Sequence, residues 1–291
     1  MASVMLNRLS SDPTVITVKK EAAEALSHLT GDPRSSGVFT DFDGTLSPIV
    51  EQPLLARPLQ GVLEVLERLV KSFNCVAVIS GRPVEFLAER LGRDLAREGL
   101  HLVGLHGLER MNSNGEVEVA PEAVPFREAL SRCTRTLRKR LPKSVLVEDN
   151  GWSVAVHWRS NPDLAGMIES LVREEAKLHR LVIHPGRKLL EIRPPIKVDK
   201  GSALERLASG LNASCFLGDD AGDLLAFDML DQLKENSGMK TLKVAVASPE
   251  CPERLISSAD LVVDGPHGAL LFLQLLCDAA EMQLDLGAGG G

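Results

Sequence analysis

The stretch Val38-Phe39-Thr40-Asp41-Phe42-Asp43-Gly44-Thr45-Leu46 decides the fold class of this chain. It begins as a short apolar run and passes directly into two aspartates, a glycine and a threonine. Such a run is typical of a strand buried on both faces, as in parallel α/β sheets. Ligands in these sheets bind beyond the carboxyl ends of the strands, which is where Asp41 to Leu46 would lie. We therefore expect an α/β fold with a binding site at this edge.

The same order of strand and helix repeats on both sides of a central segment. Uninterrupted apolar runs, which suit buried strands, alternate with apolar residues at helical spacing. This alternation predicts a doubly wound parallel sheet with right-handed crossovers. The expected strands are 38–41, 76–79, 101–105, 215–219, 244–246 and 261–263, and the expected helices are 62–70, 83–91, 201–208, 224–233 and a last one that ends near Met282.

The central segment, 108–196, follows a different pattern. Apolar and polar residues alternate as in strands with one buried face, and two amphipathic helices accompany them. The expected strands here are 116–119, 145–149, 153–159 and 188–193, with a hairpin signal at Asn150-Gly151. We expect an α+β domain inserted into the sheet domain, which would comprise 1–107 and 197–291. Residues 1–36 would form an N-terminal arm with a helix over 18–29.

The strands of the expected insertion have two unlike faces. Val154 and Val156 share one parity along their strand, and Arg159 has the other. Along the last strand of the insertion, Glu191 and Arg193 likewise alternate with apolar residues. One face of this small sheet should therefore pack on its helices, while the other presents charged groups.

Length and composition exclude several classes of protein. The 291 residues are 44% apolar, which excludes wholesale disorder, and 33 basic against 40 acidic residues give a net charge of −7. This balance, with 3% aromatic residues, argues against nucleic acid as the main partner. No apolar stretch reaches the ~20 residues of a membrane span. Five widely spaced cysteines without a CxxC pair, and no apolar signal segment, favour free thiols in the cytoplasm.

Asp41 and Asp43 lie two residues apart, so an extended chain places both side chains on one face. Two such carboxylates repel each other unless a cation lies between them, and hard oxygen ligands favour Mg²⁺. Gly44 allows a sharp turn that presents backbone N–H groups to an anion. The pattern therefore indicates a magnesium site that accepts an anionic ligand.

Three further segments fall at strand ends or helix starts of the same expected sheet. Ser80, in Ile79-Ser80-Gly81-Arg82, offers a hydroxyl to an anion, and Lys200 precedes a helix whose N-terminus could hold a phosphate. Asp219, Asp220 and Asp223 follow another buried strand. They suit a second set of metal ligands, with a hydrated acidic turn as the alternative.

Four segments, in chain order, resemble the four motifs of the haloacid-dehalogenase superfamily of phosphotransferases. They are Asp41 to Leu46, Ser80, Lys200 and Gly218-Asp219-Asp220. The insertion lies between the second and third motifs, where one group of that superfamily carries an α+β cap. Within it, the chain most resembles the trehalose-6-phosphate phosphatases, from about Val38 to Val263. The matching text is Leu105-His106-Gly107, Glu148 with Gly151, His157-Trp158-Arg159, His184-Pro185-Gly186-Arg187-Lys188 and Glu191-Ile192-Arg193-Pro194.

The resemblance implies a role for each residue of the core motifs. Asp41 would be the nucleophile that forms an aspartyl-phosphate, and Asp43 the general acid and base. Mg²⁺ would be held by Asp41, the Asp43 carbonyl and Asp219. Ser80 and Lys200 would bind the phosphate as catalytic residues, Gly44, Thr45 and Arg82 would bind the substrate, and Asp220 and Asp223 would tune the waters of the metal.

For the cap, the resemblance implies that Glu148, Arg159, Arg187 and Glu191 contact the sugar, whereas His157 and His184 have structural roles. The resulting expectation is a cytosolic, Mg²⁺-dependent phosphatase that converts trehalose 6-phosphate to trehalose and phosphate, coupled to a trehalose-6-phosphate synthase. Alternatives are a phosphatase of another sugar phosphate, such as sucrose 6-phosphate or a glycosyl-phosphoglycerate, and an inactive sugar-phosphate sensor. Asn150, Gly222 and Leu224 depart from the family pattern, and they bear on sugar specificity more than on phosphatase chemistry.

Overall fold

The chain divides into two compact units in a computed structural model that describes residues 5, 8, 9, 12–19, 22–186 and 188–288. The core unit is Met1–Val117 with Asp199–Gly291, and the inserted unit is Glu118–Val198. The sequence pattern indicated an insertion from 108 to 196, so the inserted unit begins later and ends slightly later than expected.

A nine-stranded sheet forms the core unit among the described residues, in the order β1-β13-β12-β11-β2-β3-β4-β5-β6. The strands from β13 to β4 run parallel, and β1 and β5 pair antiparallel with their neighbours. The bounds are β1 Val15–Val18, β2 Ser36–Thr40, β3 Cys75–Ile79, β4 Leu100–Gly104, β5 Glu109–Met111, β6 Val117–Val119, β11 Ala213–Gly218, β12 Lys240–Ala247 and β13 Leu261–Asp264.

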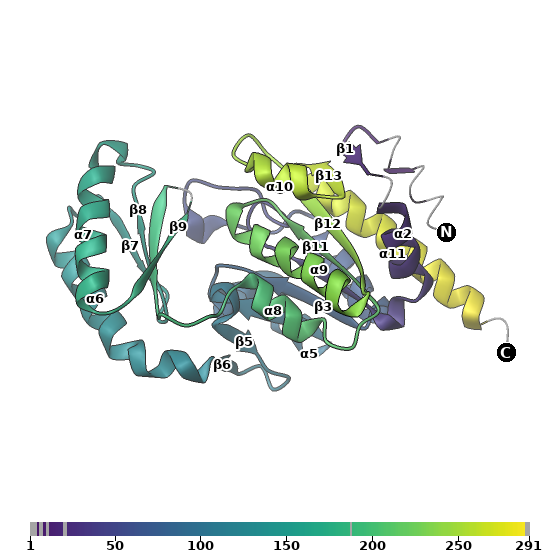
Figure 1. Cartoon of the computed structure of the whole chain (residues 1–291), viewed down its shortest axis with the longest axis horizontal. Coiled ribbons are helices and arrows are strands. Elements are labelled where there is room, and N and C mark those ends of the chain that lie inside the picture. Colours follow the sequence, from purple (N-terminus) through teal and green to yellow (C-terminus); the bar gives the residue numbers. More distant parts are fainter. Residues whose placement is uncertain (1–4, 6–7, 10–11, 20–21, 187, 289–291) are drawn as a thin grey trace. The chain divides into compact units, whose positions relative to one another are not determined.

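Helices cover both faces of this sheet, because successive residues of the inner strands point to opposite sides (Figure 1). Val38 and Val76 pack in a cluster with α2 (Ala22–Gly31), α3 (Val62–Ser72), α4 (Val84–Leu91), α5 (Arg93–Arg97) and α11 (Gly265–Ala288). Phe39 and Ala77 pack in a second cluster with α8 (Lys200–Leu207), α9 (Leu224–Ser237) and α10 (Glu253–Ser258). The expected doubly wound α/β fold is thereby confirmed.

The strand order reverses between β2 and β11. From β2 the chain proceeds to β3 and β4 on one side, and after the insertion it proceeds from β11 to β12 and β13 on the other. Crevices at such switch points, beyond the carboxyl ends of the strands, are the usual binding sites of open α/β sheets. Asp41 follows β2 and Asp219 follows β11, so both emerge at this point.

The expectations for the two edges of the core sheet need correction. β6 was expected in the sheet of the insertion, but it is the edge strand of the core sheet beyond β5, and the boundary between the two units falls within it, after Val117. An alternating pattern indicates one buried face without specifying the sheet. Within the N-terminal arm, Val18 belongs to β1, which pairs with β13, and the helix begins only at Ala22. The described part of the arm therefore contributes a strand to the sheet.

The inserted unit contains a four-stranded antiparallel sheet, in the order β7-β8-β10-β9, and the helices α6 and α7. Val154, Val156, Leu190 and Ile192 lie in one apolar cluster with both helices, which confirms the predicted apolar face. The strand β9 was not expected from the sequence pattern. The bounds are α6 Arg127–Arg140, β7 Leu146–Asp149, β8 Val154–His157, α7 Ala165–Leu178, β9 Val182–Gly186 and β10 Leu189–Arg193.

Two simpler expectations can be compared with the structure as well. All five cysteines are free thiols, as the spacing predicted. Among the described helices, including the long α11, none combines the length and apolar composition that crossing a lipid bilayer requires.

Candidate active site

Carboxylates from two strand ends meet at the switch point of the core sheet. Oxygen atoms of Asp41, Asp219 and Asp223 all lie within 4.8 Å of one another, and all three residues are buried. Asp41 follows β2, Asp219 follows β11, and Asp223 ends the short 3-10 helix η6 (Ala221–Asp223). The structure therefore brings Asp41 together with two acids that lie about 180 residues later in the sequence.

Gly44 allows this close approach. Its φ is +78°, in the left-handed region, and a Cβ atom built on it would lie 2.0 Å from Oδ2 of Asp219. Any side chain at this position would thus displace the Asp219 carboxylate. The Gly44 N–H donates to the Ser47 carbonyl at 2.7 Å, which closes the tight turn after Asp43.

Lys200 is the cation of the cluster. Its Nζ lies 2.6 Å from Oδ1 of Asp223 and 3.0 Å from Oδ2 of Asp41, and the residue is only 2% exposed. It occupies the first turn of α8, which Asp199 caps by accepting the Ser202 N–H. Burial lowers the pKa of Lys200, but the attraction of Asp223 and Asp41 outweighs it and raises the pKa above its ordinary value. Lys200 therefore remains an ammonium.

Asp223 organises the acidic loop after β11. Its Oδ2 accepts the N–H groups of Asp219 at 2.9 Å and Asp220 at 3.0 Å, while its Oδ1 binds Lys200. Asp220 in turn accepts the Gly222 N–H at 2.8 Å and caps η6. Burial raises the pKa of Asp223 to about 6, against the opposing effect of Lys200. Both oxygens of Asp223 are engaged, so its side chain fixes the loop that carries Asp219.

The environment of Asp41 fits a divalent cation. Burial raises the pKa of Asp41 well above its ordinary value; Lys200 opposes this shift, whereas Asp223, Asp220 and Asp219 increase it. Oδ1 of Asp41 is buried and has no hydrogen-bond partner among the described residues. Clustered carboxylates with a buried, unsatisfied oxygen are the donors that a hard ion such as Mg²⁺ prefers. The residues present therefore suit the expected metal.

Asp43 and Ser80 lie at the ends of neighbouring strands β2 and β3. Arg82 binds both oxygens of Asp43, with Nε 2.6 Å from Oδ2 and Nη2 2.8 Å from Oδ1. Ser80 is buried and its Oγ accepts the Arg82 N–H at 3.3 Å. The Thr45 hydroxyl is also buried and has no hydrogen-bond partner among the described residues.

Sequence reasoning gave no role to the residues that hold this strand end in place. Leu105 and His106 have left-handed φ values of +47° and +59°, and their N–H groups donate to the carbonyls of Arg82 and Ser80 at 2.9 and 2.8 Å. Strained backbone of this kind persists where the surrounding structure enforces it. Glu109 of β5 accepts the Val84 N–H at 3.0 Å, and no sequence pattern indicated that contact.

In the inserted unit, two of the expected sugar-binding residues, Glu148 and Glu191, lie on one face of the sheet. The register aligns Glu148 with Ala155, Ala155 with Glu191, and Glu191 with His184, so these four form one row across the strands. Oε2 of Glu148 lies 3.0 Å from Nε2 of His157, and Glu191 binds Arg193. Arg159 follows β8 and is half-buried, and Arg187 lies outside the described residues.

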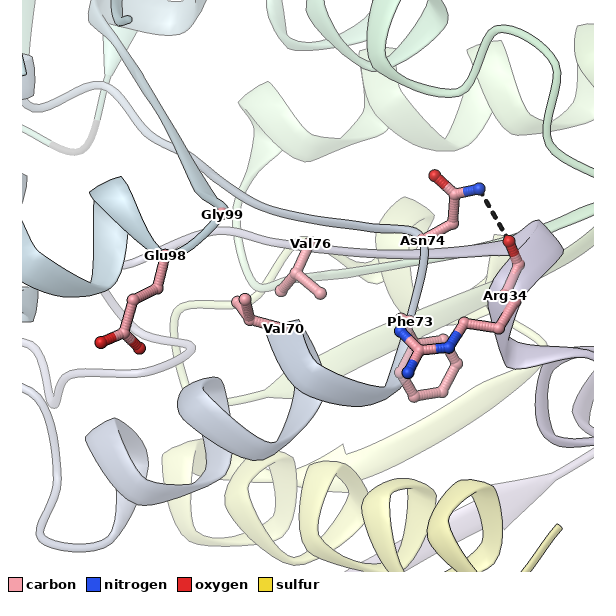
Figure 2. Close-up of a pocket in the computed structure, with 7 residues that line it drawn as sticks. All are labelled: Arg34, Val70, Phe73, Asn74, Val76, Glu98 and Gly99. Atoms are coloured by element: carbon pink, nitrogen blue, oxygen red, sulfur yellow. Dashed lines mark hydrogen bonds between the residues drawn. The ribbon is translucent and has the colours of Figure 1, made fainter. Parts of the chain in front are cut away.

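A cavity of about 380 Å³ lies at the amino ends of the core strands, on the side of the sheet opposite to the acidic cluster (Figure 2). It is located at the amino ends of β3 and β4, where the Asn74 side chain donates to the Arg34 carbonyl at 2.7 Å. Its other lining residues are Val70, Phe73, Val76, Glu98 and Gly99. Ser80 and the acidic cluster are at the carboxyl ends of the strands, so this cavity is separate from the candidate active site.

Comparison with known proteins identifies the family. The family model for trehalose-phosphatase matches residues 39–260. A trehalose-phosphate phosphatase of Mycolicibacterium paratuberculosis is 32% identical over 259 residues, which cover 85% of this chain and 63% of that protein, so the chain spans less than two thirds of this relative.

Solved structures agree with the fold. The C-terminal domain of a C. albicans trehalose-6-phosphate phosphatase superposes with a TM-score of 0.71 at 22% identity, covering 91% of this chain and 99% of that one. A haloacid dehalogenase-like hydrolase from Bacteroides thetaiotaomicron superposes with a TM-score of 0.57 at 16% identity, covering 82% and 98%. The sheet, its switch point and the matched sequence together place this chain in the trehalose-phosphatase family, on a haloacid-dehalogenase-like fold.

Proposed function

We propose that this chain is a phosphatase that hydrolyses trehalose 6-phosphate to trehalose and phosphate. The observation that carries the proposal is the buried cluster of Asp41, Asp219, Asp223 and Lys200 at the switch point of the sheet. A nucleophilic carboxylate beside a buried ammonium, among groups that suit a metal ion, is an arrangement for phosphoryl transfer. Membership of the trehalose-phosphatase family supports the choice of substrate.

Asp41 is the nucleophile of the proposed reaction. One of its carboxylate oxygens forms a bond to phosphorus as the bond from phosphorus to the sugar oxygen breaks, and Asp43 donates a proton to that departing oxygen. Asp43 then accepts a proton from the water that attacks the aspartyl-phosphate, which releases phosphate and restores Asp41. Lys200 and the Ser80 hydroxyl bind phosphate oxygens throughout, and Arg82 fixes the orientation of Asp43 beforehand.

Asp41, Asp219 and the backbone carbonyl of Asp43 are the residues that would hold Mg²⁺. When bound, this ion offsets the repulsion between the carboxylate and the phosphate dianion. Asp223 also lies within the acidic cluster, but its oxygens are engaged by Lys200 and two backbone N–H groups. We therefore assign Asp223, with Asp220, to orienting the loop that carries Asp219.

The polar face of the inserted sheet is the proposed recognition surface for the sugar. Glu148 and Glu191 lie in one row across the strands, and Arg159 follows the strand between them. A disaccharide offers many hydroxyl groups, which need donors and acceptors in several directions. We include Arg187 among the sugar-binding residues because it belongs to the matching motif His184-Pro185-Gly186-Arg187-Lys188. The five free thiols agree with a cytoplasmic location, where a synthase would supply the substrate.

The experiment is a phosphate-release assay on a panel of sugar phosphates, with and without Mg²⁺. The proposal predicts turnover of trehalose 6-phosphate that depends on Mg²⁺ and exceeds turnover of sucrose 6-phosphate and glycosyl-phosphoglycerate. A preference for either of the latter would assign the same chemistry to another substrate. Binding of trehalose 6-phosphate without phosphate release would instead indicate a sensor, and would contradict the proposal.

A further inference from the structure

The Phe86 ring of helix α4 contacts two arginines, each four residues away in the sequence. Arg82 lies just before the helix, and Phe86 and Arg90 lie within it. Residues four apart on a helix are neighbours on its surface. This spacing accounts for the Arg90 contact, and Arg82 reaches the ring from the segment before the helix: both guanidinium carbons lie 4.7 Å from the centroid of the Phe86 ring. The ring therefore binds two cations.

The same ring contacts the segment that carries the catalytic aspartates. Phe86 meets Phe42 edge to face, with ring centroids 5.9 Å apart and planes at 84°. Phe42 is fully buried and lies between Asp41 and Asp43 in the chain. Helix α4 is thus packed against the first motif through an aromatic pair, in addition to the contacts of its arginines.

Each guanidinium holds a different part of the chain that follows β2. Arg82 binds both carboxylate oxygens of Asp43. Arg90 donates from Nε to the Ala56 carbonyl at 2.9 Å and from Nη2 to the Leu54 carbonyl at 2.8 Å. The aspartate and the loop downstream of it are therefore both tied to one side of α4.

The fork of Arg82 can bind both oxygens of Asp43 only while its plane is fixed. The Arg82 backbone precedes the helix, and its side chain crosses to Asp43 from there, so the Phe86 ring is the flat surface that supports it. Its aromatic face attracts the cation as well as packing against it. Loss of the ring leaves Asp43 as an ion-pair partner but removes a contact that holds the plane of the guanidinium.

From these contacts we infer that Phe86 is a positioning residue for Asp43, acting through Arg82. The inference rests on the proposed function, because it concerns the orientation of the proposed general acid. It extends that function to a residue outside the four motifs, whose ring contacts Arg82, Arg90 and Phe42. Arg90 acts on the same ring and holds the adjoining loop.

A comparison of two small substrates isolates this role. Phenyl phosphate has a poor leaving group that needs protonation, whereas p-nitrophenyl phosphate has a good one that does not, and neither carries a sugar. Their kcat/KM values report steps up to the first irreversible one and so exclude the later hydrolysis of the aspartyl-phosphate. General acid catalysis contributes about 10²–10⁴-fold, so misalignment of Asp43 should cost about tenfold or more on phenyl phosphate and under about threefold on p-nitrophenyl phosphate.

The variants are Phe86→Leu, which removes the aromatic face, and Phe86→Tyr, which retains it. Phe86 is only partly buried, which favours folding of both. We expect Phe86→Leu to lower kcat/KM on phenyl phosphate far more than on p-nitrophenyl phosphate, and Phe86→Tyr to retain both values. The matched control is Arg93→Ala. The Arg93 guanidinium, from α5, binds the exposed Glu85 of α4, and its removal should leave kcat/KM unchanged on both substrates.

Arg82→Lys tests the same inference without altering the ring, because it keeps the charge and loses the fork. It should reproduce the selective loss, and adding Phe86→Leu to it should lower the rates little further, since the two act as one unit. Equal losses on both substrates, an additive double variant, or a Tyr variant as poor as Leu would overturn the inference. Absence of turnover by the unaltered chain would overturn the proposed function itself, and the inference with it.

Discussion

Gly44 and Asp219 are so close that a single added methyl group would overlap the carboxylate. The built Cβ atom lies 2.0 Å from Oδ2 of Asp219 and 2.3 Å from its Cγ. These residues belong to the turn after β2 and the loop after β11, the two strands that flank the switch point. The glycine therefore determines where the carboxylate of the neighbouring strand can lie.

The first prediction separates this close approach from the backbone strain of a left-handed residue. Gly44→Ala should both destabilise the protein and displace Asp219, whereas Gly210→Ala should only destabilise it. Gly210 has a similar φ of +81° but nothing within 4 Å of its Cβ position, so it is the matched control. Each should lose about 1–2 kcal/mol from the left-handed conformation. Thermal unfolding and phosphate release with Mg²⁺ measure the two effects, and comparable activity in both variants would contradict the prediction.

The second prediction concerns the nucleophile. Asp41→Asn should reduce turnover to below about one per cent of the wild-type value, since removal of a nucleophile cannot be compensated by neighbouring groups. The amide has nearly the same volume and can still accept a hydrogen bond from Lys200, so the fold should remain. Phosphate release and circular dichroism are the measurements. Activity of more than a few per cent in a folded variant would exclude an aspartyl-phosphate on Asp41.

The third prediction concerns the metal. Chelation should abolish activity, Mg²⁺ should restore it, and Ca²⁺ should not, because Ca²⁺ prefers a looser site with more ligands. Mg²⁺ should also raise the melting temperature of the wild-type chain, because an ion that binds only the folded state stabilises it. Asp219→Asn should remove that rise. An unchanged Mg²⁺-dependent rise in this variant would exclude Asp219 as a ligand.

The fourth prediction separates sugar recognition from chemistry. Arg159→Ala should lower kcat/KM for trehalose 6-phosphate about ten- to hundredfold, because a lost charged hydrogen bond costs about 1.5–3 kcal/mol. It should barely change kcat/KM for p-nitrophenyl phosphate, which has no sugar. Arg135→Ala, on the exposed side of α6, is the control. Similar losses on both substrates would assign Arg159 to the fold or the core chemistry.

Glu191 is the less suitable test of the same surface. Its carboxylate is buried and binds Arg193, so Glu191→Ala would leave a buried guanidinium without that partner. Removing one member of a buried pair destabilises a protein by about 3–5 kcal/mol. A lower melting temperature should therefore accompany any loss of activity in Glu191→Ala, in contrast to Arg159→Ala.

The sequence predicted the structure best where the pattern of neighbouring residues determines whether a segment is a buried strand. Continuous apolar runs predicted the buried strands β2, β3 and β11, and the acids directly after β2 and β11 were expected at one edge. The strands that were missed are of another kind. β1 and β5 lie in the outer part of the core sheet, and β9 contains Pro185 and Gly186, so apolar periodicity does not distinguish them from loops.

Contacts between distant segments could not be predicted from spacing. The Lys200–Asp223 and Arg82–Asp43 pairs depend on which strand ends the fold brings together. The left-handed conformation of Leu105 and His106 could not be predicted from the sequence, because it is uncommon for any residue other than glycine, even though histidine adopts it more often than most. Ser80 and Lys200 were expected near an anion from their places at a strand end and a helix start, and the resemblance assigned them to the phosphate, but their contacts within the site became visible only in three dimensions.

The strand order also has a consequence for synthesis on the ribosome. β2 lies between β3 and β11, and the whole inserted unit is translated before β11 appears. Until then, one edge of β2 presents unpaired backbone groups beside the nascent catalytic motif, a template for pairing with other chains. β1, the first of the described strands, pairs with β13, the last of them, so it has no partner until β13 is synthesised. The inserted unit, whose four strands pair only among themselves, can fold co-translationally while the core remains half complete, so the core is the part of the nascent chain that needs protection from aggregation.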